Sequence, residues 1–328
     1  MLAILMAQRV SIASPGGWDH LRIETFTSAK PKADEVQIDV AAAGVNFADI
    51  AVRQGLYSSA KKFVGWPITP GFEVSGIVSS IGSQVKDFKV GDRVLAVTFF
   101  GGYSSRVNVK AAYVHSVPRH LSFTEAASIP AVFMTAYYAI HWLARVHPNS
   151  TALIHSAAGG VGLALTQLLK AQHCQVIGVV GSSTKVDTAL HYGADIVIDK
   201  SSKELWLQAE KAYPEGFDLI FDPNGVSTLG QSYKHLAPGG LLFIYGFQSM
   251  LSKHRGRQNP LSLAQGYART PRFSPFDMVK NNRSVMAFNI SYLYERADIL
   301  EEGFRYIFDN FTNKNFKPLP IQGSSAGS

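Results

Sequence analysis

The sequence is poor in cysteine and in long apolar runs. It holds one cysteine, Cys174, among 328 residues, which excludes a disulfide within the chain and argues against a thiolate zinc site. No apolar run reaches the roughly 18 residues that span a bilayer. The opening MLAILMA has no basic segment before it, so we interpret it as a first β-strand rather than a signal peptide. A reducing, cytoplasmic location fits these absences.

The net positive charge of the chain is concentrated in one segment. The formal charge of the chain is +7, and residues 253–283 alone account for +6, with Asp277 as their only acidic residue. The near-neutral remainder argues against a nucleic-acid-binding surface. Because apolar residues such as Leu261, Leu263, Tyr267 and Phe273 are interleaved with the basic ones, the segment suits a solvated lid or, as an alternative, contact with an anionic membrane. Its basic residues are Lys253, Arg255, Arg257, Arg269, Arg272, Lys280 and Arg283.

The chain shows two patterns of predicted secondary structure. Residues 1–125 are typical of short strands separated by glycine turns. Residues 126–320 begin with a linking helix and continue as alternating strands and helices, which indicates right-handed βαβ units and a parallel sheet. We therefore predict an α/β protein with a β-barrel domain and a doubly wound dinucleotide-binding domain. Residues 321–328, QGSSAGS preceded by Ile321, are expected to form a flexible tail.

A glycine cluster marks the first βα turn of the second domain. The segment Ala157-Ala-Gly-Gly-Val-Gly162 follows the apolar strand TALIH and opens a helix. This is the context of the dinucleotide fingerprint, although alanine replaces its first glycine. Glycines there let the backbone approach a pyrophosphate, and the helix N-terminus offers free N–H groups. We predict phosphate binding rather than a simple turn at Ala158, Gly159, Gly160, Val161 and Gly162.

The end of the next strand favours NADPH over NADH. An NAD site usually places a carboxylate there, on the ribose 2′-hydroxyl. This chain has Gly181-Ser-Ser-Thr-Lys185 instead, and the side chains of Ser182, Ser183 and Lys185 could donate to a 2′-phosphate. An ordinary helix cap by Ser183 or Thr184 is compatible with this role.

Several motifs together resemble the zinc-independent quinone oxidoreductases of the medium-chain dehydrogenase/reductase superfamily. They are GVNFADIAVRQGLY, PITPGFEVSGIVSSIGSQVKDFKVGDRV and AAGGVG. The basic segment and NNRSVMAFNISYL narrow the resemblance to the branch of the synaptic vesicle membrane protein homologues. The resemblance implies a GroES-like domain, a Rossmann domain and no zinc. Asn46 stands where zinc-dependent members carry a cysteine, and the ten histidines are scattered without ligand spacing.

The resemblance also implies the catalytic residues. Hydride arriving at a quinone or enone places negative charge on its carbonyl oxygen, and a donor aimed there lowers the barrier. Asn46 and Tyr57 match positions that line this pocket, although Asn46 could instead stabilise a turn and Tyr57 pack in a loop. Glu73, in PGFEVSG, and Asp92, in a Gly-Asp-Arg turn, are interpreted as structural.

Further cofactor contacts are expected after the later strands. Thr135 matches a position whose hydroxyl reaches the cofactor, unless it bonds back to a helix carbonyl, and Tyr192 lies near the 2′-phosphate or belongs to the core. The remaining expected contacts follow three strands and are Asn224, Gly225, Gly246, Phe288 and Asn289.

The function that the sequence predicts is transfer of hydride from NADPH to a quinone or an α,β-unsaturated carbonyl. The alternative is a cofactor-binding, membrane-associated protein that uses residues 253–283 and has little catalytic activity. A homodimer is expected through the edge strand VMAFNIS. Relatives continue past FKPLPI with a helix and a returning strand, whereas this sequence stops at Ser328, so a missing return to the first domain is expected.

Overall fold

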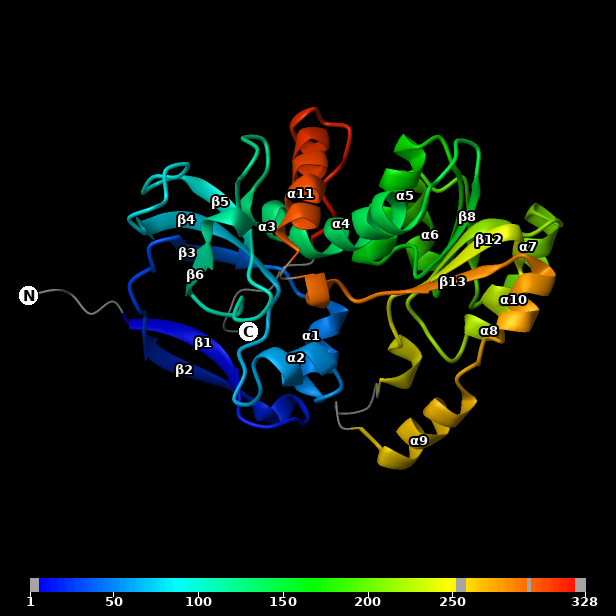
Figure 1. Cartoon of the computed structure of the whole chain (residues 1–328), viewed down its shortest axis with the longest axis horizontal. Helices are drawn as coiled ribbons and strands as arrows, with labels where there is room; N and C mark the ends of the chain where they lie inside the picture. The colour runs from blue at the N-terminus through cyan, green and yellow to red at the C-terminus, as the bar shows by residue number, and fades with distance from the viewer. Residues whose placement is uncertain (1–5, 252–257, 294–295, 322–328) are drawn as a thin grey trace, which may run out of the picture. The chain divides into compact units, whose positions relative to one another are not determined.

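The computed structural model describes residues 6–251, 258–293 and 296–321, and contacts divide them into two compact units (Figure 1). Unit 1 comprises residues 6–134 with 291–293 and 296–321, and unit 2 comprises residues 135–251 with 258–290. Each unit has its own sheet and its own buried apolar core. Two elements cross the boundary between the units, α4 (Pro130–Tyr137) and η6 (Ile290–Leu293).

Unit 1 is built on a five-stranded antiparallel sheet of order β6-β3-β4-β5-β7 and a separate β1-β2 ribbon. Apolar side chains of β3 and β4 fill its core, and register shifts between these two strands mark bulges, which bend a sheet. The strands are β1 (Met6–Ile12), β2 (Leu21–Thr27), β3 (Glu35–Ala43), β4 (Glu73–Ile81), β5 (Arg93–Val97), β6 (Arg106–Lys110) and β7 (Val114–Ser116). The helices are η1 (Trp18–His20), α1 (Phe47–Arg53), α2 (Ser58–Phe63), η2 (Ala111–Tyr113), α3 (Phe123–Ala127) and α11 (Ala297–Thr312).

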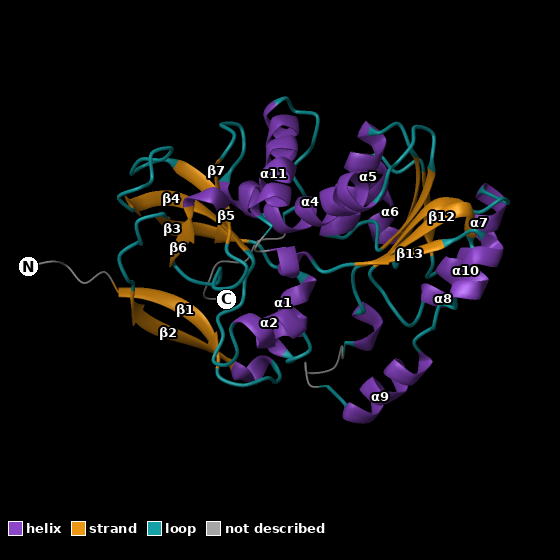
Figure 2. Cartoon of the chain, viewed as in Figure 1, coloured by secondary structure: helices purple, strands orange, loops and turns teal. Residues whose placement is uncertain are grey.

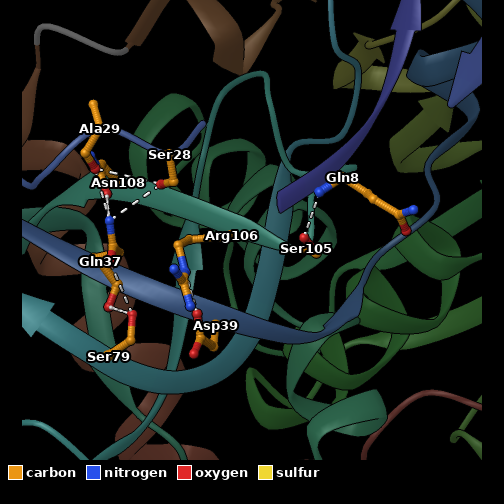
Figure 3. A network of polar contacts seen from close by, with 9 residues as sticks. All are labelled: Gln8, Ser28, Ala29, Gln37, Asp39, Ser79, Ser105, Arg106 and Asn108. Atoms are coloured by element: carbon orange, nitrogen blue, oxygen red, sulfur yellow. Dashed lines mark hydrogen bonds and ion pairs between the residues drawn. The ribbon is translucent and has the colours of Figure 1, made fainter. Parts of the chain in front are cut away.

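One buried amide fastens the centre of this sheet. Gln37 on β3 donates from Nε2 to Oδ1 of Asn108 on β6 over 3.1 Å and to the carbonyl of Ala29 over 2.9 Å (Figure 3). Its Oε1 accepts from Oγ of Ser79 on β4 over 3.3 Å. Because a buried amide is costly unless its hydrogen bonds are made, this side chain links the sheet to the segment that leads into β3.

Unit 2 is a six-stranded parallel sheet of order β10-β9-β8-β11-β12-β13, with helices packed on its strands (Figure 2). The order reverses between β8 and β11, which is the switch point where open α/β sheets bind ligands. The strands are β8 (Thr151–His155), β9 (Gln175–Val180), β10 (Ile196–Asp199), β11 (Phe217–Asp222), β12 (Leu236–Ile244) and β13 (Ser284–Ala287). The helices are η3 (Tyr138–Leu143), α5 (Gly160–Ala171), η4 (Ser183–Lys185), α6 (Val186–His191), α7 (Leu205–Ala212), α8 (Leu229–Lys234), η5 (Gln248–Met250), α9 (Pro260–Arg269) and α10 (Pro275–Asn281).

The predicted fold class is confirmed by these two sheets. β13 is the last strand of its sheet and pairs only with β12 among the described residues, and the dimer expected there stays a prediction. Of the basic segment, Lys253, Arg255 and Arg257 lie outside the described residues, whereas 258–283 form α9, α10 and their connections.

The chain returns to unit 1 after β13, which differs from the predicted boundary of 126–320 for the second domain. Apolar residues of α11 recur at helical spacing and are buried, including Phe304 and Phe311. Phe311 packs edge-on against Phe133, with ring centroids 4.9 Å apart, and Phe304 packs 4.7 Å from His115. This apolar stripe is covered only by docking on unit 1, so contacts assign α11 to that unit.

Candidate functional site

The β8–α5 turn has the geometry of a phosphate-binding loop. Ser156 adopts a positive φ of 56°, and Gly159 caps α5, with no side-chain hydrogen bond to the first turn. The N-terminus of this twelve-residue helix therefore presents backbone donors and its positive dipole end. A Cβ on Gly162 would lie 2.5 Å from the carbonyl oxygen of Ser156, so only glycine lets the helix lie this close to the strand. Ala158, Gly160 and Val161 complete the turn.

The loop after β11 faces this turn across the switch point. Ser156 Oγ donates to Oδ1 of Asn224 over 3.2 Å. Asn224 is 7% exposed, and no partner among the described residues accepts a hydrogen bond from its Nδ2. Gly225 follows with a φ of 82°, and a Cβ there would meet the Phe247 ring at 2.6 Å. A buried, unsatisfied amide beside a helix N-terminus is the signature of a polar ligand site.

The turn after β9 contains Lys185 and no carboxylate. β10 ends in buried Asp199, whose Oδ1 accepts from the backbone N–H and the hydroxyl of Ser201, and Lys200 follows it. Ser182 caps the η4 turn by accepting from the N–H of Thr184 over 3.3 Å, one residue earlier than the sequence indicated. Thr184 and Lys185 are exposed beside it. Lys200, directly after β10, donates its backbone N–H to Val180, and its Cε comes within 3.8 Å of where a Cβ would stand on Gly181. Lys200 thus joins Ser182 and Lys185 at one edge of the sheet, a neighbour that sequence reasoning missed.

Tyr192 follows α6 and precedes β10, whereas Lys200 follows the same strand. The contact expected between Tyr192 and the 2′-phosphate stays a prediction. The tyrosine is half-buried and makes an edge-on contact with His191.

The later predicted residues follow the last two strands of the sheet. Gly246 comes after β12, where a Cβ would lie 2.7 Å from the carbonyl oxygen of Pro223. Phe288 and Asn289 come after β13, and the Phe288 ring packs against Tyr138 of η3 at 5.3 Å. Thr135 lies in α4 one turn before Tyr138 and is half-buried. Since carboxyl ends of parallel strands share one edge, the residues after β8, β9, β11, β12 and β13 form one set.

In unit 1, Asn46 is held by a buried carboxylate. It caps α1, and its Nδ2 donates to Oε1 of Glu73 over 2.7 Å. Glu73 Oε2 accepts from the N–H of Ala131 over 2.7 Å. The backbone N–H of Asn46 donates to Oδ2 of Asp49 over 2.8 Å, and Tyr103 donates its hydroxyl to the same oxygen over 2.8 Å. Glu73 therefore directly contacts the predicted catalytic amide, which its sequence motif did not reveal.

Burial dominates the electrostatics of this cluster. It raises the pKa of Glu73 to about 7, against the lowering effect of the hydrogen bonds from Ala131 and Asn46. Burial also raises the pKa of Asp49, with the bonds from Asn46, Tyr103 and Gly71 opposing it. The negative charge of nearby Asp49 adds a smaller rise, so Glu73 passes to its neutral form as the pH falls through about 7. Asn46 Nδ2 carries two hydrogens, so the bond to Glu73 leaves one for a ligand.

Tyr57 caps the short helix α2 and packs on the core of unit 1. Its ring lies edge-on to Phe72 at 5.6 Å, and its hydroxyl is 2.8 Å from Oγ of Ser291. The hydroxyl group is thus tied to the segment that follows β13. Asp92 accepts from the N–H of Lys89 over 2.9 Å, as expected of a turn residue.

The described part of the chain contains no cluster of metal-binding side chains. Residues 6–251, 258–293 and 296–321 contain no group of three or more His, Cys, Asp or Glu side chains that could hold an ion. Cys174 is buried, and burial raises its thiol pKa to about 11, so a thiolate ligand is disfavoured.

Two protein-family models match the chain, one mainly in unit 1 and one mainly in unit 2. The alcohol dehydrogenase GroES-like domain matches residues 32–119, and the zinc-binding dehydrogenase family matches residues 160–305. The matches fall on the antiparallel sheet of unit 1 and mainly on the parallel sheet of unit 2.

Individual known proteins are similar to this chain over most of its length. Quinone oxidoreductase 1 of Escherichia coli is 36% identical over 74% of this chain and 74% of its own length. The synaptic vesicle membrane protein VAT-1 homolog of Danio rerio is 32% identical over 92% of this chain, which spans 62% of that relative's length. The crystal structure of E. coli quinone oxidoreductase complexed with NADPH superposes with a TM-score of 0.81 at 28% identity, covering 96% of this chain and 90% of that one.

These matches define a two-domain dehydrogenase/reductase architecture. The chain belongs to the medium-chain dehydrogenase/reductase superfamily, in the group that contains the quinone oxidoreductases and the VAT-1 homologues.

Proposed function

We propose that this chain is an NADPH-dependent oxidoreductase that transfers hydride to a quinone or an α,β-unsaturated carbonyl without zinc. The observation that carries the proposal is the set of groups at the carboxyl edge of the parallel sheet. It combines the α5 N-terminus, the buried amide of Asn224, and Ser182, Lys185 and Lys200. The likeness to an E. coli enzyme whose structure contains NADPH supports it.

The described residues fit the dinucleotide part by part. The α5 N-terminus suits the pyrophosphate. Lys185 and Lys200, with the hydroxyl of Ser182, suit a ribose 2′-phosphate, which a carboxylate at that place would repel. Asn224 and Gly225 begin the second half of the sheet, which suits the nicotinamide half.

NADPH supplies the hydride, and the protein supplies position and electrostatics. In this proposal Asn46 and Tyr57 donate hydrogen bonds to the carbonyl oxygen on which charge develops. Glu73 orients the Asn46 amide by accepting from its Nδ2. Water can protonate the product, so neither residue needs to be a general acid. We expect the enzyme to be cytoplasmic, to act on a small-molecule substrate and to form a homodimer.

The first experiment is a fluorescence titration of the chain with NADPH and NADH side by side. We expect tighter binding of NADPH. The Lys185→Ala and Lys200→Ala variants should each weaken NADPH about tenfold, because each removes a charge-assisted contact to the 2′-phosphate. Neither change should alter NADH binding, which lacks that phosphate.

Lys234→Ala is the matched control, since Lys234 is an exposed lysine on α8 of the same unit. It should leave both affinities unchanged. Equal binding of NADPH and NADH by the wild type would contradict the cofactor assignment, and binding of neither would overturn the proposed function.

A second candidate function is peripheral membrane contact by α9 and α10. Four of their apolar residues are between 77% and 88% exposed, namely Leu261, Tyr267, Phe276 and Val279. Arg269 on α9, Arg272 in the connection and Lys280 on α10 are exposed too, as is the single acidic residue of this segment, Asp277. Apolar side chains among cations suit an anionic lipid surface. No helix in the described ranges has the length and apolarity to span a bilayer.

Reversing charge on α9 and α10 separates the two functions. We expect Arg269→Glu with Lys280→Glu to abolish salt-sensitive binding to vesicles containing phosphatidylserine, since each cation near such a surface contributes about 1 kcal/mol. Reductase activity should persist if the two helices only contact lipid, and should fall in parallel if they form a substrate lid. Wild-type chain that ignores the vesicles in co-sedimentation at low salt would exclude the membrane role.

A further inference from the structure

A fully buried chain of polar groups lies beneath the switch point. Asp222, the last residue of β11, accepts on Oδ2 from Oγ of Ser232 over 2.8 Å. Ser232, on α8, also lies 2.9 Å from Nε2 of His155, the last residue of β8. All three side chains have no solvent exposure. The chain joins the ends of the two strands between which the sheet order reverses.

The proton positions in this chain follow from its geometry. Ser232 has one hydroxyl hydrogen, which it gives to the carboxylate, so its oxygen accepts from Nε2–H of His155. Nε2 therefore carries a hydrogen, and Nδ1 of His155 has no hydrogen-bond partner among the described residues. Burial lowers its pKa to about 4, although Asp222 nearby raises it, in keeping with the neutral form.

The other oxygen of the carboxylate shapes the loop above. Oδ1 of Asp222 accepts from the backbone N–H of Asn224 over 2.8 Å and from that of Gly225 over 3.2 Å. It also accepts from Oγ1 of Thr228 over 2.9 Å. A carboxylate at 0% exposure is tolerated only when its acceptors are satisfied, so these bonds hold the backbone of residues 224–228 in one conformation.

The loop so held presents an unused donor. Oδ1 of Asn224 accepts a hydrogen bond from Ser156. Nδ2 of this buried amide has no acceptor in the described structure. β11 opens the half of the sheet that takes the second mononucleotide. A carbonyl oxygen such as that of the nicotinamide carboxamide is the matching group.

We propose that Asp222, Ser232 and His155 form a positioning network that holds the Asn224–Gly225 loop, and hence the Asn224 amide, for the nicotinamide half of the dinucleotide. The inference rests on the proposed function. It assigns a role to three residues that cannot touch a substrate themselves, because all are buried behind the loop. None of them does chemistry, and each acts through Asn224.

Comparing two ligands tests the network. NADPH spans both halves of the site, whereas adenosine 2′,5′-bisphosphate occupies only the half built on β8 to β10. In the full chain, Ser232→Ala should raise the Kd for NADPH about tenfold and leave the Kd for the bisphosphate unchanged. Thr228→Val removes another donor to Asp222 at nearly constant volume and should act in the same direction, while Thr228→Ser should restore binding.

Ser227→Ala is the matched control, because Ser227 is an exposed serine in the same loop. It should change neither Kd. A Ser232→Ala variant that melts earlier but keeps the wild-type ratio of the two Kd values would show a merely structural network and overturn the inference. If Ser232→Ala does not fold, the Thr228→Val and Thr228→Ser pair decides by the same ratio. Wild-type chain that fails to bind NADPH would instead refute the proposed function.

Discussion

Gly162→Val is expected to abolish measurable NADPH binding and to lower the melting temperature. A Cβ at this position would stand 2.5 Å from the Ser156 carbonyl oxygen and 2.7 Å from Cα of Ala157. Both are backbone atoms, so α5 must move away from β8, which takes its N–H groups away from the phosphate position. Overpacking of this kind costs about 3 kcal/mol, or roughly 6–12 °C for a unit of this size. Calorimetry and NADPH fluorescence measure the two effects.

Gly230→Ala shows what a harmless glycine substitution looks like in the same unit. Gly230 lies on α8. A Cβ there would meet its nearest neighbour, Cγ of Pro271, at 3.7 Å, which is an ordinary van der Waals contact. We expect unchanged NADPH affinity and an unchanged or slightly higher melting temperature. A Gly162→Val chain that binds NADPH like the wild type would exclude the β8–α5 turn as the pyrophosphate site.

The parts of the fold around the candidate site that the sequence predicted are local. The turn from Ala157 to Gly162 lies between a strand and a helix, and both its conformation and its lack of space are set by neighbours within a few residues. The alternation of strands and helices likewise follows from short-range patterns, which is why the parallel sheet could be predicted.

The parts that the sequence missed depend on strand direction and register. Lys200 reaches Gly181 because β10 runs parallel to β9, pairing Asp199 with Val180. No spacing rule within the chain brings Lys200 to Gly181 before the sheet is formed.

Contacts between distant segments were also beyond the sequence. Glu73 follows Asn46 by 27 positions, yet it accepts from the Asn46 amide. Ser232 bridges His155, which is 77 positions away, to Asp222. A buried carboxylate or histidine in an apolar strand reads as a structural residue, and its partner is known only once tertiary packing brings the donor to it.

Acid is expected to destabilise unit 1 through His115. This residue of β7 lies against the rings of Phe304 and Phe308 of α11, with centroids 4.7 Å and 4.8 Å away. Its buried Nε2 has no hydrogen-bond partner in the described structure. Burial lowers the pKa of His115 from its usual 6.5 to about 4. The unfolded chain therefore binds a proton that the folded chain excludes.

The sign of the effect follows from this shift. The contribution of His115 to stability is complete above pH 6.5 and is lost as the pH falls toward 4. Between pH 7.5 and pH 5 the loss is about 2 kcal/mol. His155 acts in the same direction, whereas Glu73, whose pKa is raised, favours the folded state as the pH falls. The total pH profile therefore mixes opposing groups, and only a difference between variants isolates His115.

His115→Leu isolates it, because leucine keeps an apolar contact with the two phenylalanine rings and cannot be protonated. In urea unfolding we expect this variant to resemble the wild type at pH 7.5 and to exceed its free energy of unfolding by about 2 kcal/mol at pH 5. His120→Leu, at an exposed histidine nearby, should leave the difference between the two pH values as it is in the wild type. Equal acid sensitivity of His115→Leu and the wild type would mean that α11 does not seal this histidine from water.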